Sequence, residues 1–490
     1  MSKLSRRKFI ATGLAAGATP MLARDANAAP FVRHNLATPP GAAMLEKYAK
    51  AVKIMMATPD KSPLSWTFQW YTHAVPTNTS KAAALNAIYG PNPSPEKTLA
   101  NEMWNTCQAH FNAADEPFFL PWHRLYVCFF EMIIRKVLND PQFTLPYWNY
   151  SVPAGYPLPK RFRMPNDPLY GPLFRPNRRQ PVNAGQPIFT GAGSASDLNP
   201  AGSLALGNYN AFDQSIDQGI HGSVHVFVGN GQGMGAIPWA ANDPVFWMHH
   251  CNIDRLWASW DSNHSNPNTP AWLNKLFVFA SANGQGERSP VKDATNTVKC
   301  NYVYDQLATP HIVSGVHIAP LVLAEPSEAS GPPATFAAQA ESGPVTLGAQ
   351  PTRIALRSVA AAPTQGASPL AARLAALPDR RRLYLVLKDL ATTMAPETLY
   401  RVYLDLPEGT PDDPFNSNYV GSFNFFEAIA HGDDHSHAAS KPFTFDITEV
   451  ASNLEASNRL KPEHSVTIVP AGQPSADAKP VVGGVLFVEQ

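Results

Sequence analysis

Four of the chain's 15 histidines lie within residues 221–260, a stretch with few of the charged residues that are typical of a protein surface. His221 and His225 are four residues apart, so on a helix their rings project from one face, as two ligands of one metal ion require. A third imidazole is available from His249 or His250, which follow Pro244, a residue that can begin a second helix. The stretch therefore predicts a three-histidine metal site. Because neutral imidazole suits zinc, copper and iron, these residues alone do not choose the metal.

A second set of histidines precedes this stretch. His73 ends an aromatic-rich segment, His110 follows it, and His123 comes just after Pro121, which can begin a long apolar helix. An imidazole in so apolar a setting needs a hydrogen-bond partner or a metal, since an orphan polar group costs roughly 1–3 kcal/mol. Six imidazoles disfavour a hydrolytic zinc site, which uses three protein ligands on one ion. Two adjacent three-histidine sites suit a copper pair, which can bind dioxygen and oxidise an electron-rich phenol.

The composition sets limits on size and on partners. At 490 residues the chain exceeds the length at which a single core keeps growing, so two domains are expected. Lys plus Arg number 38, as do Asp plus Glu, so no net charge attracts nucleic acid or an anionic membrane. A small neutral ligand fits this balance better. Four cysteines are too few for a disulfide framework in a chain of this length.

The first 28 residues resemble a twin-arginine export signal. Arg6 and Arg7 precede a modest apolar run over residues 10–22, and Ala26-Asn-Ala28 is a small-x-small cleavage pattern. The alternative, a membrane anchor, needs a longer apolar run to span a bilayer. We expect recognition by the twin-arginine export machinery, cleavage after Ala28, and an exported protein, periplasmic or secreted, without stable membrane insertion.

Hydrophobic periodicity divides the remaining chain. Residues 29–324 hold the histidines and apolar runs of helical spacing, and we interpret them as a mainly α domain. Residues 325–380 are dominated by Ala, Pro, Ser and Gly, which predicts a flexible, protease-accessible linker. Residues 381–490 alternate with period two between Pro, Asp and Gly turns, which predicts an all-β sandwich or barrel.

Several long motifs resemble one family. The run from Asp243 to Trp257, DPVFWMHHCNIDRLW, closely resembles the second copper signature of tyrosinases and catechol oxidases, and Phe-Leu-Pro-Trp-His123-Arg with Glu131 resembles the first. The run Tyr-Val-Tyr at 302–304 is similar to the tyrosine motif that ends the catalytic domain of this family. Residues 418–437 resemble the carboxy-terminal lid of plant-type polyphenol oxidases. The resemblance covers essentially the whole mature chain.

The resemblance implies a fold and a reaction. The fold is multi-domain, a mainly α catalytic domain with a four-helix-bundle dicopper centre followed by an all-β lid. Two copper ions use O2 to oxidise o-diphenols to o-quinones, with weaker monophenol hydroxylation. A hemocyanin-like oxygen carrier and an o-aminophenol oxidase are the alternatives. The implied copper ligands are His73, His110 and His123 at one ion and His221, His225 and His250 at the other.

Some positions depart from the family pattern. His249 has a core or supporting role by this reading. The spacing of His110 and His123 is wider than usual, which requires an insertion around residues 112–116. Cys107, three residues before His110, either forms the thioether with that histidine that several members carry or is a buried free thiol.

Proton handling and latency are also implied by the family. Members with strong monophenol hydroxylation often have Asn where this chain has Gly222, and plant-type relatives often have a water-holding Glu where it has Asp217. With only the carboxylate present, we expect diphenol oxidation to exceed monophenol hydroxylation.

In family proenzymes a lid residue enters the mouth of the site, and the candidates here are Phe423, Phe425 and Phe426. We expect a latent proenzyme that an activating protease opens by cutting the linker. The nearby histidines 431, 435 and 437 are either a copper-loading tract or a solvated turn.

Overall fold

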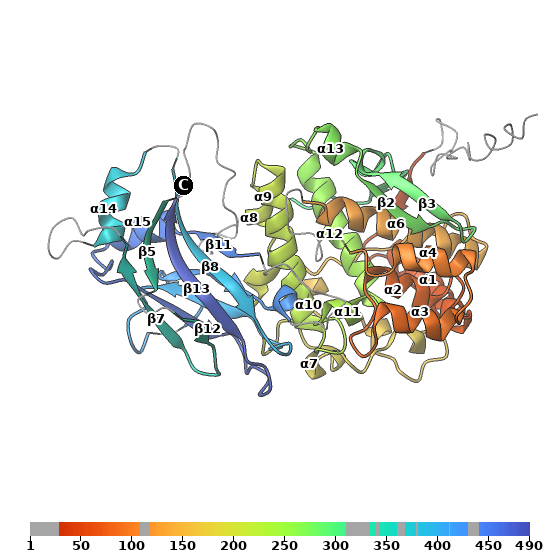
Figure 1. Ribbon diagram of the computed structural model, residues 1–490, viewed down its shortest axis with the longest axis horizontal. Helices are drawn as coiled ribbons and strands as arrows, with labels where there is room; N and C mark the ends of the chain where they lie inside the picture. Colours follow the sequence, from red (N-terminus) through yellow and green to blue (C-terminus); the bar gives the residue numbers. More distant parts are fainter. Residues whose placement is uncertain are drawn as a thin grey trace, which may run out of the picture.

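The computed structural model shows two bodies side by side (Figure 1). It describes residues 29–107, 117–309, 334–339, 343–359, 368–378, 381–410, 412–429 and 441–490. The first body is built mainly of helices, and the second is built on β-strands. This arrangement confirms the predicted fold class of a mainly α domain followed by a β-sheet domain, although the described part of the second domain also contains two α-helices. The export signal lies outside the described residues.

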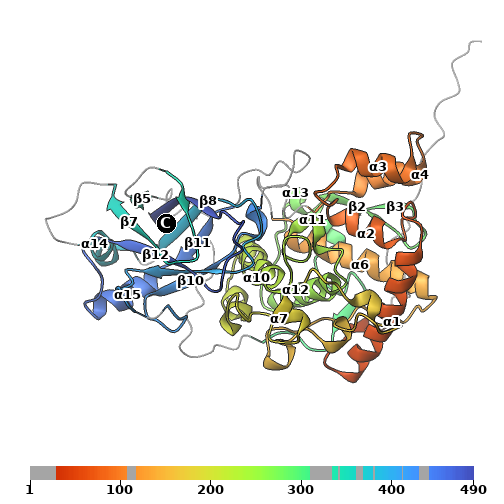
Figure 2. The same cartoon turned by 90° about the horizontal axis from the view of Figure 1, so that it is seen from below.

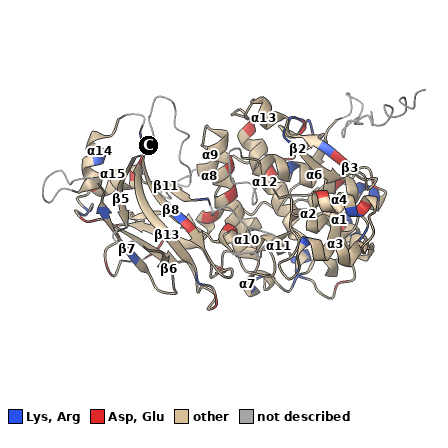
Figure 3. Ribbon diagram, viewed as in Figure 1, with Lys and Arg blue, Asp and Glu red and all other residues tan. Residues whose placement is uncertain are grey.

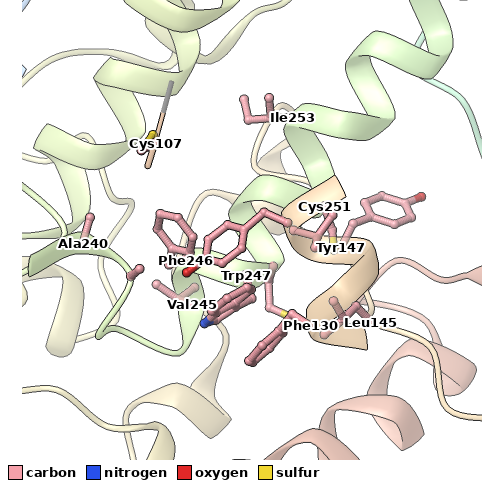
Figure 4. Packing of buried hydrophobic residues seen from close by; sticks show 14 of the residues in the cluster. Cys107, Phe130, Leu145, Tyr147, Ala240, Val245, Phe246, Trp247, Cys251 and Ile253 are labelled. Carbon is pink, nitrogen blue, oxygen red and sulfur yellow. The ribbon is translucent and has the colours of Figure 1, made fainter. Parts of the chain in front are cut away.

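Four helices of the first body carry or adjoin the predicted histidines. They are α2 (Trp66–His73), α6 (Phe119–Leu138), α10 (Gly222–Val228) and α12 (Val245–Asp261). Helices α6 and α12 pack directly on each other. In the core between them Trp247 of α12 lies against Phe130 of α6, beside Phe246 (Figure 4).

Local signals place the ends of these helices. The Ser65 hydroxyl accepts a hydrogen bond from the Phe68 N–H at 3.1 Å and caps α2. The Asp243 carboxylate accepts a hydrogen bond at 3.0 Å from the N–H of Val245, the first residue of α12, which begins directly after Pro244. The histidine at the end of α2 and the pair near the start of α12 are thereby fixed in register.

The described part of this body has eight further α-helices. They are α1 (Pro39–Ala57), α3 (Lys81–Tyr89), α4 (Pro95–Met103), α7 (Gln180–Asn183), α8 (Ala201–Leu204), α9 (Tyr209–Gln214), α11 (Ile237–Ala240) and α13 (Pro270–Leu273). None of the helices in the described part of the chain combines the length and the apolarity that crossing a bilayer requires.

The helix that carries the first histidine of the later stretch is irregular. Between α9 and α10 the chain forms the π-helical segment η5 (Ser215–His221), with non-helical backbone angles at Gly219. A π-turn inserts one extra residue and rotates the helix beyond it, and such turns are frequent at functional sites. His221 and His225 still point to one place, although they straddle the junction of η5 and α10.

Two short strands join the beginning and the end of the helical body. Strand β1 (Phe31–Arg33) pairs in parallel with β4 (Tyr302–Tyr304). Arg33 is fully buried there and pairs with Glu131 of α6 at 3.0 Å. The hydroxyls of Tyr302 and Tyr304 both donate to Asp254 of α12 at 2.5 Å. The predicted tyrosine motif therefore ties the last strand to the helix that carries His249 and His250. A separate hairpin pairs β2 (Leu276–Ala280) with β3 (Gly286–Pro290).

The second body is one nine-stranded, barrel-like sheet. Its strands run in the order β10-β9-β12-β7-β5-β13-β8-β11, β6 pairs with β13, and every pair is antiparallel. The end strands β10 and β11 approach each other. The strands are β5 (Ala334–Gln339), β6 (Val345–Thr346), β7 (Thr352–Ser358), β8 (Leu383–Ala391), β9 (Tyr400–Leu404), β10 (Tyr419–Phe423), β11 (Phe443–Asp446), β12 (Ser465–Pro470) and β13 (Val481–Glu489). Helices α14 (Pro369–Ala376) and α15 (Thr448–Ala456) pack together beside it.

The predicted linker over residues 325–380 differs from the structure. Strands β5, β6 and β7 and helix α14 all lie inside that range. Ile354 and Leu356 of β7 alternate with exposed residues and belong to the core of the β body. The Ala, Pro and Ser content of this range outweighed that short alternation in our interpretation. The β body therefore includes residues from 334 onward and not only residues 381–490.

The two bodies meet beside helix α10. The 3-10 turn η7 (Phe426–Ala428), which comes after strand β10, contacts α10. Seen from below, α10 lies where the helical body faces the β body (Figure 2). Leu399 and Phe426 of the β body belong to the hydrophobic core of the helical body. The junction is therefore packed like an interior.

Candidate metal centre

The structure brings together buried histidines from five elements, α2, α6, η5, α10 and α12. His221, His225, His249 and His250 form one group of potential ligands, and His73, Cys107 and His123 form another. Within each group the donor atoms all lie within 4.8 Å of one another. The groups adjoin, because the rings of His123 and His250 stack with centroids 4.2 Å apart. Segments far apart in sequence therefore build two neighbouring sets of donors.

In the first group the imidazoles come from the end of α2 and the first turn of α6. The Nδ1 of His123 hydrogen-bonds the Phe119 carbonyl at 2.9 Å, which directs Nε2 into the centre. The sulfur of Cys107 lies 3.6 Å from that Nε2. His110, predicted as the third ligand, lies outside the described residues, so the choice between a thioether to Cys107 and a buried free thiol at Cys107 stays open.

In the second group His221 and His225 are oriented by backbone carbonyls. Nδ1 of His221 donates to the Asp217 carbonyl at 3.0 Å, and Nδ1 of His225 donates to the Met234 carbonyl at 2.8 Å. Their Nε2 atoms then face each other at 3.0 Å, close enough to bind one ion. A hydrogen bond at one ring nitrogen that leaves the other for a metal is the usual arrangement of ligating histidines.

The adjacent pair on α12 brings two further imidazoles to this group. His249 is held by the Tyr150 hydroxyl, 2.9 Å from its Nδ1, and its Nε2 has no hydrogen-bond partner among the described residues. Neither nitrogen of His250 has such a partner there. Buried polar atoms without partners are costly, roughly 1–3 kcal/mol each, and a bound metal ion would account for them. Both histidines are placed to contribute, so the choice of His250 remains a prediction.

Burial sets the protonation state of these imidazoles. It lowers the pKa of His73, His123, His225, His249 and His250 well below the ordinary value of 6.5. The pKa of His221 falls to about 3 for the same reason. At neutral pH the rings are therefore uncharged and hold lone pairs available for a metal. A cluster of neutral imidazoles fits copper well.

Aromatic rings enclose the two groups. Phe119 lies between His123 and His221, with ring centroids 4.7 and 4.6 Å from theirs. Phe246 of α12 lies against His73 and His250, at 5.0 and 4.1 Å. These contacts fix the imidazole planes and leave little room for water around the donors.

The two predicted proton-handling residues lie next to His221. A carboxylate oxygen of Asp217 is 3.2 Å from the Nδ1 of His221, and the side chain is fully buried. Burial raises the pKa of Asp217 to about 6, against the opposing charge of Lys441. Gly222 opens α10, and a Cβ added there would lie 2.8 Å from the Asn424 amide nitrogen of the β body.

Of the three predicted lid residues, only Phe426 reaches the histidines. Its ring stacks on His225 with centroids 4.2 Å apart, and meets His221 edge-on at 5.7 Å. Phe423 and Phe425 instead pack against Tyr400 in the β body. The sequence alone offered no signal for Tyr150, Asn424 or Lys441, because each joins the site only through the tertiary fold.

Comparisons with known proteins agree with this geometry. A family model described as the common central domain of tyrosinase matches residues 63–263, and a domain of unknown function matches residues 335–490. The tyrosinase HcTyr1 of Hahella sp. is 30% identical over 475 residues, covering 90% of this chain and 96% of its own length. A chloroplastic polyphenol oxidase of Malus domestica is 27% identical, covering 84% and 71%.

The fold comparison extends over both bodies. The solved structure of latent apple tyrosinase covers 95% of this chain and 98% of its own, with a TM-score of 0.61 at 22% identity. The predicted family is thus confirmed by sequence relatives that span both domains. The chain belongs to the tyrosinase family of copper oxidases and is a polyphenol oxidase.

Proposed function

We propose that the chain holds two copper ions and uses O2 to oxidise o-diphenols to o-quinones. The observation that carries this proposal is the direct contact of the two donor groups, where His123 and His250 stack at 4.2 Å. Two ions held there would be close neighbours, and together they would supply the electron-transfer chemistry that reduces O2. One O2 oxidises two diphenols to two quinones and is reduced to two waters.

The ligand assignment is part of the proposal. One ion is held by His73, His110 and His123, and the other by His221, His225 and His250. His249 supports the second set through its bond to Tyr150. The backbone carbonyls at Asp217, Met234 and Phe119 fix the tautomers, which supports Nε2 as the binding atom on three of these rings.

The same site favours diphenols over monophenols. Hydroxylating a monophenol requires that the phenol first lose its proton, and a carboxylate aided by an amide could assist that step. Asp217 supplies the carboxylate, but Gly222 supplies no amide. We therefore expect catechols to be oxidised faster than tyrosine, whose turnover should begin with a lag.

We further propose that the full-length chain is latent. Phe426 fills the approach to His225 and His221, so a phenol cannot reach them while the β domain stays in place. Residues 310–333 join the two domains, and a protease that cuts there allows the β domain to leave. On this proposal the catalytic domain spans residues 29–309 and the lid domain residues 334–490. Residues 1–28 direct export and are removed after Ala28.

A substrate panel tests the function. Formation of an o-quinone from catechol and from tyrosine, and of the o-quinone imine from o-aminophenol, is followed spectrophotometrically with copper-loaded protein, before and after limited proteolysis. We expect quinone from catechol, slower product from tyrosine, and a large gain after cleavage. A chain that binds O2 reversibly but forms no quinone from catechol after cleavage would be an oxygen carrier. Equal lag-free rates on catechol and tyrosine would contradict the proposed preference.

A further inference from the structure

A partly buried ionic contact crosses the junction of the two domains. Lys441, two residues before strand β11, places its Nζ 3.5 Å from a carboxylate oxygen of Asp217. Asp217 is fully buried, whereas 26% of the Lys441 side chain remains exposed. Asp213 lies one turn before Asp217 and is also fully buried. Acidic positions along α9 and η5 lie at this junction (Figure 3).

Two hydrogen bonds also join Gln218 of η5 to the β domain. The Gln218 amide donates to the Lys441 carbonyl at 3.2 Å, and the Asn424 amide donates to the Gln218 carbonyl at 2.8 Å. Asn424 is also the residue that an added Cβ at Gly222 would meet. The β domain therefore contacts η5, next to the start of α10, through one ion pair and two hydrogen bonds. These contacts lie next to the turn that carries Phe426.

The charges of the buried carboxylates favour a protonated Lys441 beside them. Burial and the charge of Asp217 raise the pKa of Asp213 to about 7. Burial would lower the pKa of Lys441, but the charges of Asp217 and Glu427 raise it above its ordinary value, so the ammonium is retained. A buried carboxylate that loses its counter-charge is strongly destabilised. Withdrawing the β domain therefore requires that Asp217 give up this partner.

We propose that Lys441 is the latch of the lid: it pairs with Asp217 only when Phe426 covers the histidines, and this pair holds the β domain closed. The proposal rests on the proposed latency and names its regulation. The β domain then inhibits the site in two ways. Phe426 blocks the approach to the histidines, and Lys441 pairs with the Asp217 carboxylate beside His221. Release of the lid frees both at once.

The test compares lysine variants in the full-length chain. Lys441→Met removes the charge and keeps much of the stem, and Lys441→Arg keeps the charge. Lys388→Met is the matched control, since Lys388 is a partly exposed lysine on β8 whose charged partner is its neighbour Asp389. Catechol oxidation is measured before cleavage, and again after cleavage and removal of the β domain. Hydrogen exchange of α10 and of residues 419–429 is measured in copper-free and copper-loaded protein.

We expect Lys441→Met to raise the uncleaved activity about tenfold, because the lost pair is partly exposed and weaker than a fully buried one. Exchange in α10 should accelerate with it, while Lys441→Arg and Lys388→Met stay latent. After the β domain is removed, all variants should match the parent. Parental latency and exchange in Lys441→Met would overturn the latch, as would the same gain in Lys388→Met.

The exchange measurement also separates this proposal from the function. If the cleaved parent does not oxidise catechol, the proposed function fails, yet faster exchange of α10 in Lys441→Met still supports the latch. If the cleaved parent is active and exchange is unchanged, the latch fails alone. Should Lys441→Met not fold, Lys441→Gln provides the same loss of charge with a polar side chain, and the same outcomes apply.

Discussion

Replacing Phe426 by alanine should activate the uncleaved enzyme. The Phe426 ring is 1% exposed, and it packs across the junction on His225 and His221. Truncating a buried phenylalanine costs about 3–5 kcal/mol when its surroundings do not collapse. The lower value fits a contact that one domain makes on another, and about 3 kcal/mol corresponds to roughly a hundredfold change in the closed-to-open ratio.

The assay is initial-rate catechol oxidation by copper-loaded, full-length protein without protease. We expect Phe426→Ala to approach the rate of the cleaved parent, because truncation both weakens the closed state and opens a path to the histidines. Phe415→Ala is the control, since Phe415 is 75% exposed on the same domain and should stay latent. A Phe426→Ala chain that folds, binds copper and remains as latent as the parent would refute the assignment of this ring as the lid plug.

Three further predictions concern the site itself. Gly222→Asn in the cleaved enzyme should raise the ratio of tyrosine to catechol turnover severalfold; an unchanged ratio argues against the missing amide. His221→Ala should bind one copper ion instead of two by metal analysis and lose catechol oxidation; two retained ions contradict its role as a ligand. Burial holds the pKa of His221 at about 3, so in copper-free protein this residue contributes stability above pH 6.5 that is lost as pH falls toward 3. The free energy of unfolding from urea titrations should therefore fall as the pH is lowered across that range, by about 1.4 kcal/mol per pH unit for this residue; a flat profile argues against it.

Much of the metal centre could be predicted from local sequence. His221 and His225 are separated by one helical turn, and His123 follows a helix-starting proline, so short-range rules place their rings. The period-two strands at the carboxy terminus predicted the second domain for the same reason. Spacing also predicted that His249 or His250 would join the second group. It could not choose between them, and the fold brings both into reach.

The rest depends on contacts between distant segments. Tyr150 supports His249 from about a hundred residues away, and Asn424 and Lys441 meet η5 across more than two hundred. No local sequence pattern predicts such contacts between distant residues. The linker prediction failed because composition outweighed the alternating Ile354 and Leu356 of a short strand. Of the phenylalanines at 423, 425 and 426, the turn geometry of η7 places only Phe426 at the site.

Anomalous diffraction at the copper edge, from crystals of the full-length, copper-loaded protein, tests the central claim most directly. We predict two copper peaks a few ångströms apart, one beside His73 and His123 and the other beside His221, His225 and His250, with the Phe426 ring above them. A single peak, or two peaks away from these imidazoles, would contradict the account of a lidded copper pair.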